Sequence, residues 1–500
     1  MKIFSAEQIR DLDAHTIENE PIASIDLMER AASVFTDWFC EHYPDEDRPV
    51  AVFCGIGNNG GDGLAVARLL HRRFYNVTVF WCKISDKTSP DFQANLNRLP
   101  IREAVPVITI EKGDDLPELA PDAILIDAIF GSGLNRPVEG YWAKLMEYLN
   151  QSSCPIVAID IPSGLFADQH TDSTTIKAER TLSFQLPKLA FLYPENHQRV
   201  GEWACRSIGL APEFIAQTET SNYYLDQPFI CSFLKKRNKY DHKGTYGHAL
   251  LIMGSYGKVG AALLAARACL RSGAGLTTVH VPKCAFEIVQ GQVPEAMLSI
   301  DSDDHFFTTL PNLDSYRAIG VGCGLDQQDT TCKALQELLQ KSQVPLVIDA
   351  DALNILGKNQ SWQLDLPKNS ILTPHPKEFE RLFGATANHF ERNALQRQKA
   401  RELGVFIILK GAHTCIASPE GKCYFNSTGN PGMGTGGSGD VLAGFITGLL
   451  AQSYTSLEAC ILGVFLHGLA GDLAAEDVGQ EALIAGDIIH YIGKAFKKCS

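Results

Sequence analysis

The sequence predicts an α/β protein of two domains, each an α/β/α sandwich in which helices cover both faces of a mostly parallel sheet. Short apolar runs typical of buried strands recur along the chain, for example Pro49 to Gly55 and His248 to Ser255. Segments with the spacing of amphipathic helices separate them, and glycine-rich or polar turns follow several of them. This alternation favours parallel sheets with crossover helices, and 500 residues are enough for roughly two to four domains.

The composition is that of a globular protein, with 45% apolar and 20% charged residues. A formal net charge of −14 argues against binding to nucleic acid or to an anionic membrane, because both require a basic face. Anionic ligands must therefore be bound by local structure. No run approaches about eighteen consecutive apolar residues, and the first segment lacks the apolar core of a signal peptide, so we expect a cytoplasmic protein.

Fourteen cysteines are spread along the chain without a C-x-x-C pair. Four of them, Cys54, Cys82, Cys323 and Cys415, fall in runs with the pattern of buried strands. We expect reduced core residues, and neither a zinc site nor a disulfide framework.

The N-terminal half begins with two predicted helices. Ser5 and Gln8 have the spacing of a capping box, and the segment from Ser24 to Phe39 places apolar side chains on one face. The strand Pro49 to Gly55 comes next, followed by the loop GIGNNGGDG and the helical segment LAVARLLHRRF. Strand, glycine turn and helix is the order used by phosphate-binding folds.

The loop after this strand formally matches G-x-G-x-x-G. A dinucleotide fingerprint is nevertheless doubtful, because the next strand, NVTVFWC, ends at Cys82 without the acid that would hold a ribose. Asn58, Asn59 and Asp62 lie among the glycines, where their oxygens could bind a cation or ligand hydroxyls. The alternative is a polar loop that satisfies its own backbone.

Two more polar loops follow predicted strands in this half. Asp127 ends one strand, and Asp160 and Ser163 follow another. Because the carboxyl ends of parallel strands share one edge of the sheet, these loops and the first one should converge on a crevice. Farther along, Lys188 is either an anion contact or solvated surface.

A polar, aperiodic segment from Ala216 to Asp226 suggests a boundary near residue 220, dividing the chain into domains 1–219 and 220–500. The basic segment that follows, Lys235 to Lys243, is either a solvated arm or part of a nucleotide entrance. Beyond it the strand, loop and helix alternation resumes, with polar residues again gathered at predicted strand ends, among them Asp349, Asp351 and His375.

The segment NPGMGTGGSGDVLAGFITGLL, from Asn430 to Leu450, has five glycines within eight residues and then an apolar helical run. Glycines let consecutive backbone N–H groups face one point, and a helix beginning near Gly439 directs its positive end to the same place. The sequence therefore predicts a phosphate site. The G-K-[ST] ending of a Walker loop is absent, so a P-loop nucleotidase is disfavoured.

Asp440 follows these glycines directly. A carboxylate at a phosphate site repels the ligand unless it has a task such as accepting a proton from an attacking hydroxyl. We interpret Asp440 as a general base. The alternative is an ordinary cap at a helix N-terminus.

Several motifs in order, NNGGDG, DAIFGSGL and DIPSG, resemble the epimerase domain of the NAD(P)H-hydrate repair family over nearly all of residues 1 to 215. The resemblance implies a Rossmann-like α/β/α sandwich, Asp160 at the reacting ring as a catalytic residue, and a potassium ion (K⁺) bound by Asn59, Asp127 and Ser163. It further implies that the hydrated nucleotide contacts Asn58, Asn59, Gly60, Gly61, Asp62, Gly131, Ser132, Gly133, Leu134, Asn135, Arg136, Pro137 and Asp160.

The motifs GSYGKVGAALLAA, LTPHPKEF, LKGAHT and GMGTGGSGDVLAG resemble the dehydratase domain of the same family, which is ribokinase-like, over roughly residues 230 to 500. Taken alone, HPKEF is either a metal or acid–base site or a structural loop. The resemblance implies that the hydrated cofactor faces Ala261, Gly324, His375, Pro376, Lys377, Glu378, Phe379, Glu380, Arg381 and Asp440. It implies that the adenine nucleotide contacts Lys410, Gly411, Ala412, His413, Thr414, Asn430, Pro431, Gly432, Met433, Gly434, Thr435, Gly436, Gly437, Ser438 and Gly439.

Together the two resemblances imply a bifunctional enzyme that repairs NADH and NADPH hydrates. The first domain would interconvert the epimers at C6, and the second would remove water from the S form at the expense of ADP or ATP. Magnesium (Mg²⁺) is expected for phosphoryl transfer without a recognisable ligand set, and we expect a homo-oligomer. Two alternatives remain: a vitamin-pathway kinase with a regulatory N-terminal half, and a nucleotide-binding interaction module without turnover.

Overall fold

The computed structural model describes residues 1–99 and 105–499. The chain divides into two compact units. The N-terminal unit comprises Lys2–Thr220 with Asn388–Phe390, and the C-terminal unit comprises Ser221–Ala387 and Glu391–Ser500 with Met1.

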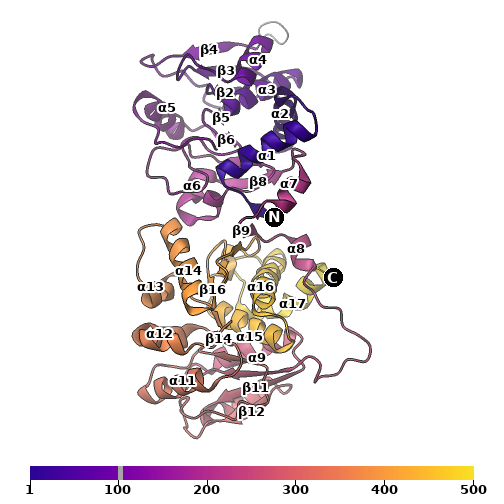
Figure 1. The fold of residues 1–500 in the computed structure, drawn as a ribbon, viewed down its shortest axis with the longest axis vertical. Helices are drawn as coiled ribbons and strands as arrows, with labels where there is room; N and C mark the ends of the chain where they lie inside the picture. Colours follow the sequence, from indigo (N-terminus) through magenta and orange to yellow (C-terminus); the bar gives the residue numbers. More distant parts are fainter. Residues whose placement is uncertain (100–104, 500) are drawn as a thin grey trace. The chain divides into compact units, whose positions relative to one another are not determined.

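The sheet of the N-terminal unit is parallel throughout, in the order β4-β3-β2-β5-β6-β7-β8 (Figure 1). Its strands are β2 (Val50–Cys54), β3 (Val77–Cys82), β4 (Val107–Ile110), β5 (Ile124–Ala128), β6 (Ile156–Ile159), β7 (Arg180–Phe184) and β8 (Glu202–Arg206), preceded in the chain by the short β1 (Lys2–Ile3). Its helices are α1 (Ala6–Asn19), α2 (Ser24–His42), α3 (Asn58–Arg72), α4 (Pro90–Arg98), α5 (Gly140–Gln151), α6 (His197–Val200) and α7 (Pro212–Gln217), with 3₁₀ turns η2 (Leu189–Leu192) and η3 (Pro194–Asn196).

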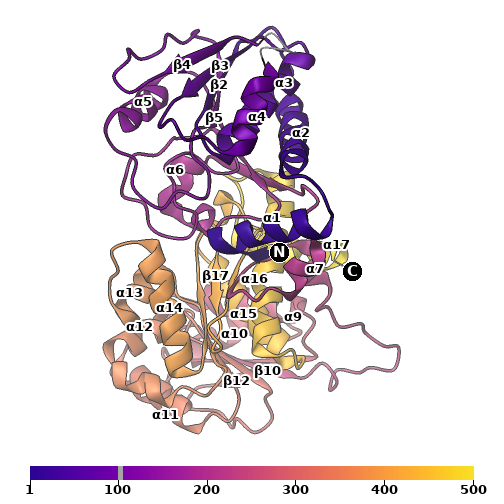
Figure 2. The same cartoon turned by 45° about the horizontal axis from the view of Figure 1, so that its top comes forward.

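Alternate residues of the central strand β2 point to opposite faces of this sheet. Val52 and Cys54 belong to a buried cluster shared with α2 and α3, whereas Phe53 belongs to a second cluster shared with α5. Figure 2 shows α2, α3 and α4 on one side of the strands and α5 on the other. The N-terminal unit is therefore the predicted three-layer sandwich.

Helix α3 begins at Asn58, six residues before the expected LAVARLLHRRF segment, so the polar glycine loop forms its first turns. The glycines explain this. A Cβ at Gly60 would lie 2.1 Å from the carbonyl oxygen of Gly55, and a Cβ at Gly63 would lie 2.6 Å from Cβ of Ala128. Only glycine lets the helix begin this close to the ends of β2 and β5.

In the C-terminal unit the strand order runs β9-β18-β17-β16-β15-β14-β13-β10-β11-β12. Neighbouring strands are parallel except where β17 pairs with β16 and β18. The strands are β9 (Asn222–Tyr224), β10 (His248–Ile252), β11 (Leu276–Val281), β12 (Met297–Ile300), β13 (Ala318–Val321), β14 (Leu346–Ile348), β15 (Ile371–Leu372), β16 (Phe406–Leu409), β17 (Cys415–Ala417) and β18 (Cys423–Phe425).

Helices flank this second sheet on both sides. Figures 1 and 2 show α11 to α14 on one side and α9, α15, α16 and α17 on the other. The helices are α8 (Gln227–Cys231), α9 (Val259–Arg271), α10 (Phe286–Gln292), α11 (Asp329–Lys341), α12 (Ala350–Lys358), α13 (Pro376–Phe383), α14 (His389–Leu403), α15 (Ser438–Ala451), α16 (Ser456–Val478) and α17 (Ala485–Lys498), with 3₁₀ turns η4 (Lys283–Ala285), η5 (Gln360–Asp365) and η6 (Pro431–Met433).

The apolar helices α15 and α16 form much of the core of the C-terminal unit. Within the described residues, α16 alone is long and apolar enough to cross a membrane, and 78% of its most apolar window is buried inside the protein. Burial on this scale is what a core helix requires. All fourteen cysteines are free in the described chain, and Cys54, Cys82, Cys323 and Cys415 are buried, with Cys323 in the turn after β13.

Candidate functional sites

Three predicted polar residues meet at the carboxyl ends of β2, β5 and β6, which are neighbours in the N-terminal sheet. The backbone N–H of Ser163 donates to Oδ2 of Asp127 at 2.7 Å, and its hydroxyl donates to Oδ1 at 2.6 Å. The backbone N–H of Phe130 donates to the Ser163 hydroxyl at 2.7 Å, and Nδ2 of Asn59 donates to the Phe130 carbonyl at 3.1 Å. The predicted trio of Asn59, Asp127 and Ser163 is thus assembled around Phe130.

Asp127 is 1% exposed, and its hydrogen-bond donors, Ser163 and the N–H of Ile129, are neutral. Burial raises the pKa of Asp127 to about 6, although these hydrogen bonds lower it in part. A buried carboxylate beside neutral hydroxyl, amide and carbonyl oxygens fits a monovalent cation. In the described ranges no group of three or more His, Cys, Asp or Glu has the arrangement of a metal site.

Asp160 follows β6 with a left-handed backbone, φ +64°. Its Oδ1 accepts hydrogen bonds from the Phe184 N–H at 3.0 Å and from Nζ of Lys188 at 2.5 Å. Lys188 is 2% exposed, so it is not the solvated lysine that one alternative expected but the buried partner of Asp160. Among the described residues no hydrogen bond is made to the other oxygen, Oδ2, which leaves it available to a ligand.

The two predicted substrate loops of this unit lie side by side. A Cβ at Gly131 would lie 3.0 Å from Cβ of Asn59, so the segment from Gly131 to Pro137 runs beside the first turn of α3. Most of that segment is partly or fully exposed, as a ligand-binding loop requires. Asp62, on the same turn, has a pKa raised well above its usual range by burial and by the charges of Asp160 and Asp13.

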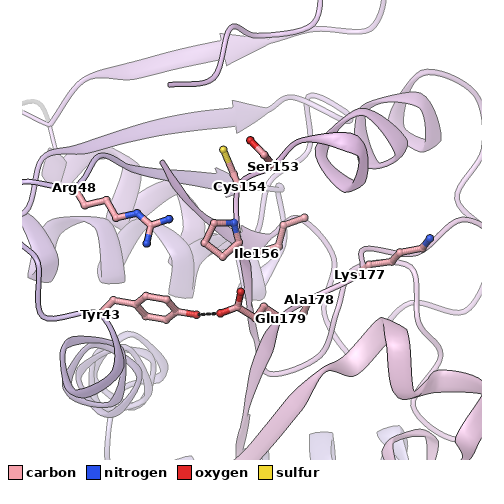
Figure 3. A pocket seen from close by; sticks show the side chains of 9 residues that line it. Tyr43, Arg48, Ser153, Cys154, Ile156, Lys177, Ala178 and Glu179 are labelled. Carbon is pink, nitrogen blue, oxygen red and sulfur yellow. Dashed lines mark hydrogen bonds between the residues drawn. The ribbon is translucent and has the colours of Figure 1, made fainter. Parts of the chain in front are cut away.

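A separate hollow of about 460 Å³ lies at the opposite end of the strands, where β6 and β7 begin. Figure 3 shows Tyr43 pointing at Glu179, to which its hydroxyl donates a 2.9 Å hydrogen bond, while Lys177 points away. Arg48 and Cys154 also line it. None of the predicted site residues lines this hollow. The predicted site residues lie at the carboxyl ends of the strands instead.

In the C-terminal unit, a cavity of about 660 Å³ brings the two predicted nucleotide segments together. His375 and residues from both segments line it, together with Leu442, Val464, His467 and Gly468. Of the two predicted segments, the lining residues are Lys410, Gly411, Ala412, Thr414, Asn430, Pro431, Met433, Gly434, Thr435, Ser438 and Gly439.

Four predicted nucleotide contacts, His413, Gly432, Gly436 and Gly437, do not line this cavity. The His413 ring is held at the Asn426 carbonyl, with Nδ1 3.0 Å from the oxygen. Gly437 is the N-cap of α15 at φ +93°, where a Cβ would lie 2.5 Å from Cδ1 of Leu264. Glycine is therefore required at 437 by both conformation and space.

Asp472, on α16, holds the start of the glycine loop by two hydrogen bonds. Oδ2 of Asp472 accepts from the Gly429 N–H, and Oδ1 accepts from Nδ2 of Asn430, both at 2.9 Å. Because the first N–H groups of a helix lack intrahelical partners, the start of α15 offers donors and a positive dipole end to the cavity. This arrangement suits a phosphate.

Asp440, in the first turn of α15, lies in a charged cluster that the sequence did not fully predict. Lys410 and Asp349 form an ion pair of 2.8 Å, with the Asp349 side chain 3% exposed. A Cβ at Gly439 would lie 3.4 Å from Oδ2 of Asp349 and 3.5 Å from Nζ of Lys410, which places the pair against this turn.

The environment of Asp440 suits a base. Burial raises its pKa, a hydrogen bond with Cys323 lowers it, and the charge of Asp349 raises it again. Burial raises the pKa of the Cys323 thiol well above its usual value, so the thiol remains a protonated donor.

The HPKEF segment begins helix α13. Nδ1 of His375 accepts from the N–H groups of Lys377 and Glu378, and the Glu378 carboxylate accepts from the His375 N–H, forming a capping box. The structural alternative is therefore correct for these contacts, although His375 also lines the cavity. The prediction that Phe379 faces the cofactor is wrong: it is fully buried and packs edge-on against Phe383, because α13 turns its apolar face inward.

Ala261 and Gly324 are adjacent, as predicted for one surface. A Cβ at Gly324 would lie 3.1 Å from Cβ of Ala261 and 2.9 Å from the Lys258 carbonyl. Nζ of Lys258 lies 3.3 Å from carboxylates of both Asp326 and Asp351. The Lys258 ammonium thus pairs with two carboxylates at this surface.

Comparison with known proteins identifies both halves. A family model described as NAD(P)H-hydrate dehydratase matches residues 249–494, and one described as YjeF-related protein N-terminus matches residues 24–190. The Bifunctional NAD(P)H-hydrate repair enzyme Nnr of Moorella thermoacetica is 36% identical, covering 98% of this chain and 96% of that protein. The chain belongs to the bifunctional NAD(P)H-hydrate repair enzyme family.

Solved structures resemble the dehydratase half of this repair enzyme family member. A ribokinase-like superfamily protein from Enterococcus faecalis is 28% identical with a TM-score of 0.50, covering 57% of this chain and 98% of that chain. An ADP/ATP-dependent NAD(P)H-hydrate dehydratase from Bacillus subtilis, co-crystallised with ATP and Mg²⁺, is 31% identical with a TM-score of 0.49, covering 56% and 99%. Because relatives match both halves under one function, the kinase with a regulatory half is not favoured.

Proposed function

We propose that a domain of residues 1–219 interconverts the R and S epimers of NADH and NADPH hydrates. A domain of residues 220–500 dehydrates the S form at the expense of ADP or ATP. The observation that carries the proposal is the cavity lined by the glycine loop and Lys410, with Asp440 in the first turn of the helix that follows the loop and Asp349 paired with Lys410. The same chain also carries the Asp160 site.

The dehydration chemistry follows from the poor leaving ability of hydroxide. Asp440 takes the proton from the C6 hydroxyl as the hydroxyl oxygen attacks the terminal phosphoryl group of the nucleotide. The bond from that phosphorus to the bridging oxygen breaks, so AMP leaves from ADP, or ADP from ATP. The N–H groups of the glycine loop and the Lys410 ammonium stabilise the charge on the transferring group. The ring nitrogen lone pair then expels phosphate, and loss of a C5 proton restores the double bond.

Mg²⁺ would supply charge neutralisation at the nucleotide phosphates. Asp349, a buried carboxylate beside the loop, is engaged with Lys410. We therefore expect the ion to be held mainly by phosphate oxygens and water, as is common for this metal.

In the N-terminal unit we assign Asn59, Asp127 and Ser163 to a potassium ion. The charge balance supports this, because the cation would compensate the buried Asp127 carboxylate. The ion would order the loop that begins at Phe130, and so fix the predicted substrate segment from Gly131 to Pro137. Asp160 would then act on the C6 hydroxyl through its open oxygen.

The proposal extends to the cellular setting. We propose a cytoplasmic homo-oligomer without nucleic-acid or membrane partners, consistent with the charge of −14. Sedimentation at several protein concentrations would test the assembly.

The experiment that tests the function uses hydrated NADH. The protein is incubated with the mixed epimers and with ADP, ATP or neither, and the absorbance of the dihydronicotinamide ring is followed. Recovery of both epimers with one of the nucleotides is expected. No recovery with either nucleotide contradicts the proposal.

A further inference from the structure

Asp13, on α1, lies at the Asp160 site although no sequence motif includes it. Its neighbour Leu12 belongs to the same buried cluster as Leu186, on the turn before Lys188. The Leu186 carbonyl accepts a 3.5 Å hydrogen bond from Nζ of Lys188. Helix α1 and the turn before Lys188 therefore contribute to one buried cluster, and the charges of Asp160 and Lys188 both act on Asp13.

The two oxygens of Asp160 are unequal. Oδ1 is held by the Phe184 N–H and by Lys188, and Lys188 is itself held by the Ser183 hydroxyl at 2.8 Å. Asp160 is thus oriented with one oxygen free to act as a base, and Lys188 is its positioning residue.

The Asp13 carboxyl, by contrast, has the raised pKa of a group that can act as an acid. Burial and the negative charge of Asp160 raise its pKa to about 7, while the charge of Lys188 lowers it in part. Asp62, on α3, is a second acidic group at this site. Burial and the charges of Asp160, Asp13 and Asp91 raise the pKa of Asp62. The site thus combines the lysine-paired carboxylate of Asp160 with a carboxyl group of raised pKa that can carry a proton near neutral pH.

Epimerisation at C6 needs both groups, and this step rests on the function proposed above. C6 carries the hydroxyl and the ring nitrogen. When a base removes the hydroxyl proton, the O–H electron pair forms a C=O bond and the C6–N1 bond breaks. The bond pair moves to N1, which takes a proton from an acid. Rotation about C5–C6 presents the other face of the aldehyde, and the reverse transfers close the ring without any oxidant.

We propose that Asp13 is the acid that protonates N1 in this step, paired with Asp160 as the base. Each proton returns in the closing step, so neither group is consumed. Ring opening also avoids the cation that would form if the hydroxyl left, which would lose a C5 proton and end as the dihydronicotinamide.

The test is the full-length Asp13→Asn variant. Epimer exchange is measured without nucleotide by chromatographic separation of R and S hydrates from pH 5 to 9. We expect kcat to fall at least about a hundredfold with little change in KM, because a positioned acid contributes about 10² to 10⁴-fold. Wild-type exchange should decline as pH rises through about 7, where Asp13 loses its proton, and the variant should lack this decline.

Three further measurements separate the outcomes. Asp11→Asn, an exposed carboxylate on the same helix, should behave as wild type. Asp13→Glu should keep part of the activity and the alkaline decline, which a purely structural role does not predict. The third measurement is dehydration of the S epimer by Asp13→Asn, which should match the wild-type rate if the variant is folded.

Near wild-type exchange by Asp13→Asn, or an unchanged alkaline decline, overturns the inference. The inference is also overturned if Asp62→Asn loses epimer exchange and the alkaline decline while Asp13→Asn keeps them, because Asp62 would then be the acid. If Asp13→Asn does not fold, Asp13→Glu compared with Asp13→Gln gives the same decision. A wild-type protein without epimer exchange refutes the proposed function itself, whereas an active wild type with an active Asp13→Asn refutes only this inference.

Discussion

At the residue scale, Asp127 decides whether the N-terminal site needs a cation. It is buried among neutral donors, and a potassium ion would offset the energy of keeping its charge there. We expect epimer exchange to be faster in potassium than in sodium or tetramethylammonium salts, and Asp127→Ala to abolish the difference. Dehydration of the S epimer by the same variant is the control for folding. Equal exchange rates in all three salts contradict the assignment.

At the element scale, the contact between α9 and α15 sets the position of the glycine loop. A Cβ at Gly444 would lie 2.1 Å from the Ala265 carbonyl oxygen, so Gly444→Ala must push the helices apart. Overpacking of this kind costs about 1 to 3 kcal/mol, and we expect a lower unfolding temperature and weaker nucleotide binding.

Gly493 provides the matched control. It is exposed on α17, and a Cβ there would meet nothing within 4 Å. Gly493→Ala should be neutral or stabilise the protein by about 0.5 to 1 kcal/mol, because alanine is the better helix former. Calorimetric melting of both variants checks the pair, and equal destabilisation contradicts the packing argument.

The elements also show what could be predicted from sequence. The strands and the convergence of Asn59, Asp127 and Ser163 follow from apolar runs and from the rule that parallel strands share a carboxyl edge. The early start of α3 does not, because glycine is a poor helix former and only the close approach to Gly55 and Ala128 explains it.

Partners distant in the chain are equally invisible to local patterns. The Lys188–Asp160 pair spans 28 residues and the Lys410–Asp349 pair spans 61. A lone lysine carries no signal of such a partner. Asp13 belongs to an ordinary amphipathic helix, and no local pattern marks its closeness to Asp160 and Lys188.

At the scale of the whole molecule, the chain divides into two units with separate hydrophobic cores. Units with their own cores can fold alone. We expect fragments 1–219 and 220–500, expressed separately, to keep epimer exchange and nucleotide-dependent dehydration respectively. Activity that returns only on mixing the fragments would contradict independent folding.

The most direct test of the central claim, two distinct activities in one chain, compares Asp160→Asn with Asp440→Asn in the full-length protein. Each amide keeps the shape of its carboxylate but loses its basicity, which should lower the affected kcat by at least about a hundredfold. Epimer exchange and S-hydrate dehydration are measured for both, with ADP and ATP affinity by calorimetry. We predict that Asp160→Asn loses only epimer exchange, and that Asp440→Asn loses only dehydration while still binding nucleotide. Loss of nucleotide binding together with dehydration in Asp440→Asn, or loss of both activities in either variant, would contradict the account.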